Sequence, residues 1–271
     1  MKLAVNYSPQ SSQLCREGVI KLDLFKCPDW PELVEAALKE QAAYIHFSLA
    51  TLTHNLADAN WQEVSHFLAL TVTQNINLHL LTEPTLDPDD LAQTKNAILQ
   101  IIGLVNRVID RFGPVRVVLE NTPMPVVGRD YMRPIVDTQA ISYIIEKTGC
   151  RLLLDLSHAI ISAATLEVEA FSYIQSLPFN RLAEVHITGM RIENGQLVDH
   201  RAMRAEDWPV LECALAQIRS GCWSEPNIIA FEYGGFGKIF QPYSDPAVLE
   251  AQVPQMYRLV HPEEDGRQVI N

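Results

Sequence analysis

The stretch "RLLLDLSHAI", from Arg151 to Ile160, predicts a short buried strand with two ionisable side chains at its end. Three leucines run directly into Asp155, and His158 follows three residues later. Short apolar runs between helical patterns are typical of the strands of a parallel sheet. The question is why a buried apolar strand should end in a carboxylate and an imidazole.

Seven further apolar runs of this kind occur in the 271 residues, at 2–7, 19–25, 42–49, 76–83, 115–121, 182–189 and 227–233. Helical periodicity predicts helices at 30–41, 61–74, 88–112, 135–148, 168–177, 208–220 and 244–260. The segment 8–18 is short and has a poor helical pattern, and Pro254 is expected to interrupt the last helix.

Eight strands that alternate with helices predict a single (β/α)8 TIM barrel over residues 1–271. An open, doubly wound sheet is the alternative. Such a sheet carries a glycine-rich phosphate loop after its first strand, and the sequence has none there.

The charge and the cysteines exclude some classes of function. The formal net charge of −12 repels phosphate backbones, so we expect no nucleic-acid partner. No apolar run approaches the roughly 20 residues that span a bilayer, and the N-terminus becomes polar too early for a signal peptide. The five scattered cysteines form no C-x-x-C pair, which predicts reduced thiols and a cytoplasmic location.

Ionisable side chains stand at the ends of six consecutive predicted strands. In a barrel these ends meet on one face, where the active site lies. The residues are His46, His79, Glu120, Asp155 with His158 after it, His186 and Glu232. The loop that follows the seventh strand adds Asp199 and His200, of which we expect one to be a ligand.

So many ionisable groups around one axis are costly to bury unless something neutralises them. A divalent metal does so, since carboxylates and neutral imidazoles are its ligands. We therefore predict a metal centre. For Glu184, pairing with a helix outside the barrel stays open, and a non-enzymatic binding barrel is a further alternative for the chain.

Four motifs carry a resemblance: "VVLENTP", "LLLDLSH", "EVHITG" and "FEYGG". Together they resemble the xylose-isomerase-like barrel superfamily, which includes sugar isomerases and epimerases and type IV apurinic endonucleases. The resemblance implies a divalent metal held by Glu120, Asp155, His186 and Glu232. His158 matches the histidine that follows the aspartate in that superfamily.

Residues 152–190 are similar to the central segment of the multinuclear iron-dependent oxidase family, to which the methanobactin biosynthesis oxidase belongs. His46 and His79 match the two early ligand histidines of that family. The resemblance implies iron, O₂ as co-substrate, a peptide substrate whose cysteine is oxidatively rearranged, and a small partner protein that presents the peptide.

The chain also departs from the family pattern. Met190 replaces a histidine, Asp199-His200-Arg201 replaces an Asp-x-His pair, and the second strand keeps only Asp23 of an acidic pattern. The number of metal ions therefore stays open.

Three functions follow from these observations. The first is a multinuclear non-haem iron oxidase acting on a peptide or small molecule. The second is a sugar isomerase or epimerase with one manganese, cobalt or magnesium ion. There Glu120 and Glu232 act as acid and base, and His158 binds a substrate oxygen. The third is a zinc phosphodiesterase, against which the negative charge argues.

Overall fold

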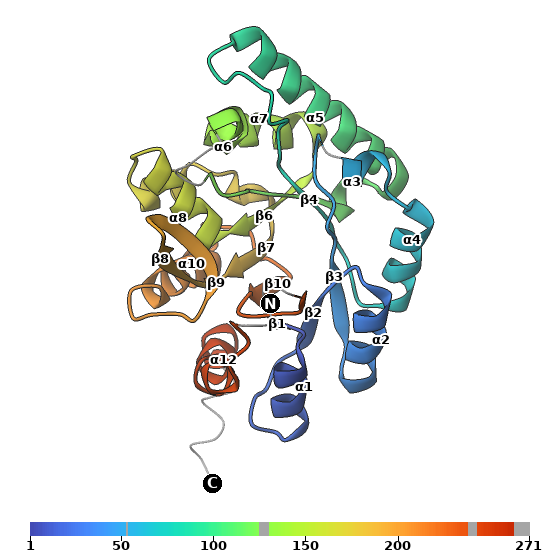
Figure 1. Cartoon of the computed structure of the whole chain (residues 1–271), viewed down its shortest axis with the longest axis vertical. Helices are drawn as coiled ribbons and strands as arrows, with labels where there is room; N and C mark the ends of the chain where they lie inside the picture. The colour runs from blue at the N-terminus through green and yellow to red at the C-terminus, as the bar shows by residue number, and fades with distance from the viewer. Residues whose placement is uncertain (53, 125–129, 238–242, 263–271) are drawn as a thin grey trace.

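Eight parallel strands form one sheet that curves into a nearly closed barrel in the computed structural model (Figure 1). The structure describes residues 1–52, 54–124, 130–237 and 243–262. The strands are β1 (Lys2–Asn6), β2 (Leu24–Pro28), β3 (Ala43–His46), β4 (Ile76–His79), β5 (Val117–Glu120), β6 (Arg151–Asp155), β7 (Leu182–Ile187) and β10 (Ile228–Phe231). Their order in the sheet is β3-β2-β1-β10-β7-β6-β5-β4, which confirms the predicted (β/α)8 barrel.

Helices surround this sheet on its outer side (Figure 1). They are α1 (Pro9–Arg16), α2 (Pro31–Glu40), α3 (His54–Ala57), α4 (Trp61–Leu70), α5 (Leu91–Phe112), α6 (Arg133–Val136), α7 (Thr138–Thr148), α8 (Leu156–Thr165), α9 (Ala170–Gln175), α10 (Trp208–Arg219) and α12 (Pro246–Val260). Short 3-10 turns η1 (Pro114–Arg116), η2 (Asp130–Met132) and η3 (Phe179–Arg181) precede β5, α6 and β7. None of the described helices is long and apolar enough to cross a membrane.

Two predictions about helices were wrong. The segment after β1 does form a helix, α1, because Ser8 and Ser11 build a capping box in which each side chain accepts the other residue's backbone N–H. Pro254 lies inside α12 without ending it. The buried face of α12, which includes Val253 and Met256, packs on the core and outweighs the missing backbone hydrogen bond.

The second strand lies later than predicted, at Leu24–Pro28 instead of 19–25. Asp23 precedes it and accepts a hydrogen bond from the backbone N–H of Leu3, at the amino end of the barrel. His261 contacts the same Asp23 oxygen at 2.7 Å. Asp23 is therefore remote from the carboxyl ends of the strands, and Lys26 is the charged residue that β2 contributes to the centre.

The barrel closes between its two edge strands, β3 and β4, by only a short seam. The backbone N–H of His79 donates to Leu49 O, and that of Thr51 donates to His79 O, both at 2.9 Å. Ala50 and His79 form an isolated parallel bridge there. The seam thus lies just beyond β3, next to His79.

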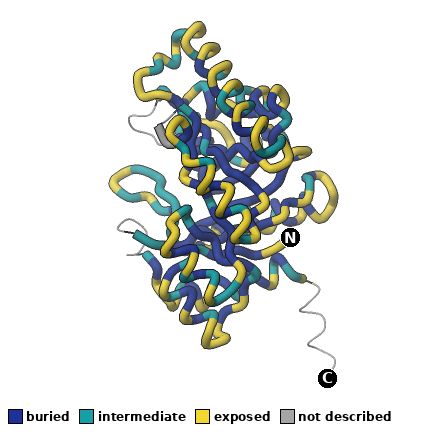
Figure 2. The backbone as a smooth tube through the Cα atoms, turned by 90° about the vertical axis from the view of Figure 1, so that its right-hand side faces the viewer, coloured by how far each residue is buried: buried dark blue, intermediate teal, exposed yellow. Residues whose placement is uncertain are grey.

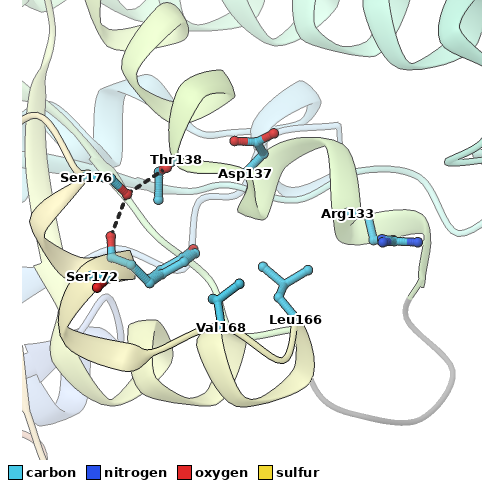
Figure 3. Close-up of a pocket in the computed structure, with 8 residues that line it drawn as sticks. Arg133, Asp137, Thr138, Leu166, Val168, Ser172 and Ser176 are labelled. Atoms are coloured by element: carbon cyan, nitrogen blue, oxygen red, sulfur yellow. Dashed lines mark hydrogen bonds between the residues drawn. The ribbon is translucent and has the colours of Figure 1, made fainter.

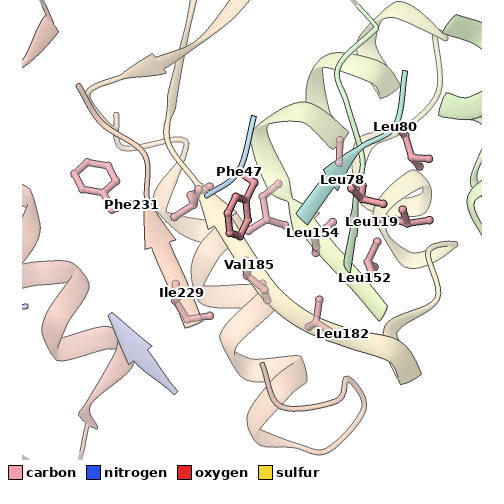
Figure 4. Close-up of a cluster of buried hydrophobic side chains, with 14 of the residues drawn as sticks. Phe47, Leu78, Leu80, Leu119, Leu152, Leu154, Leu182, Val185, Ile229 and Phe231 are labelled. Atoms are coloured by element: carbon pink, nitrogen blue, oxygen red, sulfur yellow. The ribbon is translucent and has the colours of Figure 1, made fainter. Parts of the chain in front are cut away.

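Side chains alternate between the two faces of the sheet. Leu119, Leu152, Leu154 and Val185 belong to the large core between the sheet and its helices (Figure 4). Smaller clusters inside the barrel contain Ala4, Leu24, Tyr44, Ile228 and Ala230, and Val118, Leu153 and Ala183. The strands are the most deeply buried part of the chain, and the helices expose their outer faces (Figure 2).

Polar residues come two positions after the inner apolar ones and so point to the same side at the carboxyl end of the barrel. Leu24 is followed in this way by Lys26, Tyr44 by His46, Val118 by Glu120, Leu153 by Asp155 and Ala230 by Glu232. This alternation places the predicted ligands on a common axis.

A two-stranded hairpin, β8 (Gly189–Glu193) and β9 (Gln196–Arg201), follows β7. It replaces the loop that the sequence predicted, and it carries Asp199 and His200. A Cβ on Gly189 would lie 2.0 Å from Ala202 O, so only glycine permits this close approach of the two backbones.

Candidate metal centre

Glu120 lies between two histidines from the edge strands. Its Oε2 is 3.3 Å from His46 Nε2 and 3.2 Å from His79 Nε2. The two histidine nitrogens are 3.2 Å apart. Burial lowers the pKa of His46 well below its usual value, and the positive charge of Lys26 adds to the effect. His46 is therefore neutral and able to donate a lone pair.

Asp155 uses its two carboxylate oxygens differently. Oδ1 accepts the backbone N–H of His158 at 2.8 Å and caps α8. Oδ2 faces the centre and has no hydrogen bond within the described structure. Burial raises the pKa of Asp155 to about 6, with His158 opposing the rise and Glu232 adding to it.

His158 lies in the first turn of α8, and its two ring nitrogens have separate partners. Nδ1 is 2.9 Å from the carbonyl oxygen of Asn121, and Nε2 is 3.0 Å from Asp199 Oδ2. Burial opposes a charged ring, but the carboxylates of Asp155 and Asp199 outweigh it and raise the His158 pKa well above its usual value. Because a carbonyl can only accept, Nδ1 carries a proton, and Nε2 is the nitrogen that would bind a metal after losing its own proton.

His186 is oriented from inside the barrel by Glu184. His186 Nε2 lies 2.8 Å from Glu184 Oε1, while Nδ1 lies 3.0 Å from Glu232 Oε1. Asn75 donates a further hydrogen bond to Glu184 at 3.2 Å. Glu184 is thus buried in the barrel, and the alternative that it pairs with an outer helix is wrong. Burial opposes a charged His186, but Glu232 and Glu184 raise its pKa to about 10.

A carboxylate that holds the remote nitrogen of a ligand histidine fixes which nitrogen faces the metal. We predict that Glu184→Leu weakens metal affinity by about 10–100-fold. Glu184→Gln keeps an acceptor oxygen and should lose less metal affinity. Titration of both variants with Mn²⁺ measures the graded loss, and equal affinity of Glu184→Leu and wild type would contradict it.

Lys26 is a residue of the centre that the sequence analysis missed. Its ammonium group pairs with Glu232 Oε1, and both side chains are almost fully buried. Burial opposes the charged form of Glu232, but His186 and Lys26 hold the Glu232 pKa well below its usual value. The alternation from Leu24 to Lys26 was the available signal, but it is visible only when the strand is placed correctly.

Seven of the nine predicted ligands come together in this region. Their donor atoms form groups within 4.8 Å of one another: His46, His79 and Glu120; Glu120, Asp155 and His158; and Asp155, His186 and Glu232. A fourth group contains His46, Glu184 and His186.

The buried atoms of these groups test whether a metal fits. Glu120 Oε2 and Asp155 Oδ2 have no hydrogen bond among the described residues. Buried polar atoms without such partners are costly. A metal bound by the oxygen and nitrogen donors of these groups would satisfy both, and this donor set suits iron, manganese or zinc.

The remaining two predicted ligands lie outside these groups. Asp199 reaches the centre through its contact with His158 Nε2. His200 has a left-handed backbone with φ of 56° and places Nδ1 2.9 Å from the carbonyl oxygen of Glu232. A ligand role for either residue stays a prediction.

A cavity of about 290 Å³ opens above the centre. His46, His79, Glu120, His158, His200 and Glu232 line it on the metal side. Tyr7, Trp30 and Phe236 add aromatic surface to its wall. The cavity gives a small substrate group direct access to the donor atoms.

A second hollow of about 410 Å³ lies outside the barrel between α6, α7, α8 and α9 (Figure 3). Ser176 donates a hydrogen bond to Thr138 there, beside the apolar side chains of Leu166 and Val168. None of the predicted ligands lines it, and we therefore place the chemistry at the mouth of the barrel.

Comparison with known families identifies the chain. Residues 40–222 match the model of the family described as RiPP precursor modification enzyme MbnB/TglH/ChrH. The chain belongs to this family. The match confirms the predicted relationship, and the MbnB/TglH/ChrH segment contains every candidate ligand except Glu232.

A curated relative matches part of the chain. A UPF0276 protein of Rhizorhabdus wittichii is 26% identical over 157 residues, which cover 57% of this chain and 52% of the relative. The chain thus matches about half the length of this relative.

Two solved structures show the same fold. D-psicose 3-epimerase in the presence of D-fructose has a TM-score of 0.59 at 10% identity, covering 96% of this chain and 99% of that one. The AP endonuclease, family 2, from Brucella melitensis has a TM-score of 0.59 at 14% identity, covering 93% and 98%. The family and the four donor groups together support a metal-dependent TIM-barrel enzyme that uses a divalent ion.

Proposed function

We propose that this chain is a multinuclear non-haem iron enzyme that oxidatively modifies a peptide. The observation that carries the proposal is the pair of separate donor groups, His46–His79–Glu120 and Asp155–His186–Glu232, joined through Glu120, Asp155 and His158. A single ion needs only one such group. The family description, a modification enzyme for peptide precursors, supports a peptide as the substrate.

The proposed ligands fall into two sets, one for each ion. His46, His79 and Glu120 would hold one ion, and Asp155, His186 and Glu232 a second. Glu120 is close to both sets, because it shares a donor group with Asp155 while its Oε2 faces His46 and His79. Bound iron would supply electron transfer to O₂.

The cavity limits what the substrate can place at the centre. A hollow of about 290 Å³ takes one or two peptide side chains. A small partner protein that delivers the peptide is part of the proposal. We also propose Glu120, Glu232 and His158 as catalytic residues.

A sugar epimerase is the second candidate, because Glu120, Asp155, His186 and Glu232 come from the four neighbouring strands β5, β6, β7 and β10. That reaction needs one ion and two carboxylates that move a proton. It leaves His46 and His79 without a metal to bind.

Metal content separates these functions. We predict that anaerobic purification followed by elemental analysis finds more than one iron per chain, and that the His46→Ala/His79→Ala double variant loses one of them. One manganese ion would favour the epimerase, and three zinc ions the phosphodiesterase. Wild-type protein that binds no divalent metal under these conditions would overturn the proposal.

A further inference from the structure

Lys26 is a cation already present among the predicted metal ligands. It lies in the middle of β2, paired with Asn6 at the end of β1, and its side chain extends past β1 to Glu232, which follows β10. Lysine is rarely this deeply buried without a partner. Of the described residues that line the cavity, Lys26 is the only lysine or arginine.

The ammonium group pairs with a carboxylate that one donor group needs. Glu232 Oε1 contacts both Lys26 Nζ and His186 Nδ1. The same glutamate and histidine belong, with Asp155, to one of the four donor groups. A metal ion at this group therefore competes with Lys26 for Glu232.

The other main group has no such competitor. Glu120 Oε2 has no hydrogen bond among the described residues, and its close contacts are the imidazoles of His46 and His79. Charge adds to the competition at Glu232. The Asp155–His186–Glu232 group has two carboxylates, and Lys26 cancels one of the two negative charges that would attract a cation.

We propose that Lys26 weakens metal binding at Asp155–His186–Glu232, so that the ions bind in order, first at His46–His79–Glu120. The inference rests on the proposed function, because it takes these groups as metal ligands. It adds to that function a residue of this chain that sets the number of ions bound at a given metal concentration.

Mn²⁺ titration, with unbound Mn²⁺ counted by electron paramagnetic resonance, tests the inference on the full chain. The wild type should show a tight class of sites and a second class that is weaker or empty. Lys26→Met should tighten the second class by about tenfold or more and change the first much less, because Lys26 pairs with Glu232 and acts on His46 only through its charge. Lys26→Arg keeps the charge and should behave like wild type, as should Lys39→Met at an exposed position.

The outcomes separate the two proposals. Two equally tight sites in wild type, or an unchanged or weakened second class in Lys26→Met, would overturn the inference and leave the proposed function standing. Wild type without bound metal would overturn the proposed function. If wild type binds no metal but Lys26→Met does, the role of Lys26 is still supported. If neither protein binds metal, both proposals are overturned.

A second measurement covers the case in which Lys26→Met does not fold. In wild-type crystals soaked with Mn²⁺, occupancy at His46–His79–Glu120 should exceed that at Asp155–His186–Glu232. Where the second ion is bound, Lys26 Nζ should have left Glu232 Oε1. Equal occupancy with Lys26 still paired to Glu232 would contradict the inference.

Discussion

Replacing Glu120 by glutamine is expected to remove most of the bound metal while the barrel remains folded. Glu120 contributes to two of the donor groups and is within 3.6 Å of three imidazoles. A neutral amide is a poor metal ligand, so the substitution weakens more than one position at once. We expect metal affinity to fall by at least about 100-fold, because loss of an outer-shell partner alone costs 10–100-fold.

Elemental analysis after anaerobic loading measures this loss, and thermal unfolding of metal-free protein measures the fold. Because Glu120 Oε2 is buried without a hydrogen bond, Glu120→Gln should unfold no earlier than metal-free wild type. Glu83→Gln is the matched control, since Glu83 follows the neighbouring strand β4 but is exposed. A Glu120→Gln variant with wild-type metal content would remove Glu120 from the ligand set.

Asp155 gives the second large effect, because two substitutions separate its two roles. Asp155→Ala loses the cap on α8 and the oxygen that faces the centre. Asp155→Asn keeps an oxygen that can accept the His158 N–H but loses the charge. We expect both variants to lose metal, but only the alanine variant to lose about 0.5–2 kcal/mol of stability from the missing cap.

Chemical denaturation of the metal-free variants measures the difference in stability, and Mn²⁺ titration measures the loss of metal. Asp137→Ala is a suitable control, since Asp137 caps α7 in the same way at an exposed position. It should lose stability without losing metal. Full metal binding by Asp155→Asn would mean that Asp155 is only a helix cap.

The sequence predicted the site well where an apolar run ends in an ionisable residue. At Glu120, Asp155 and Glu232 the alternation of a strand fixes which side chains face the barrel axis, and the fold brings them together. Recognising the strands and the barrel they form was therefore sufficient to find these residues.

Other residues could not be placed from the pattern of apolar and polar residues along the chain. Lys26 was missed because the predicted second strand, 19–25, ended before it. The place of Glu184 depends on Asn75, which lies far away in sequence and satisfies a carboxylate in the normally apolar interior. Asp199 and His200 depend on the β8–β9 hairpin, whose close approach at Gly189 is a tertiary contact.

Metal binding by the two edge histidines should affect how easily the short seam between β3 and β4 opens. His46 ends one edge strand and His79 ends the other, where few backbone hydrogen bonds hold the edges together. An ion bound to both imidazoles would restrict local opening of the barrel at this point. We expect the amide hydrogens of His79 and Thr51 to exchange with solvent more slowly in metal-loaded than in metal-free protein. Mass-resolved hydrogen exchange at the seam would then report occupancy of the centre without any substrate.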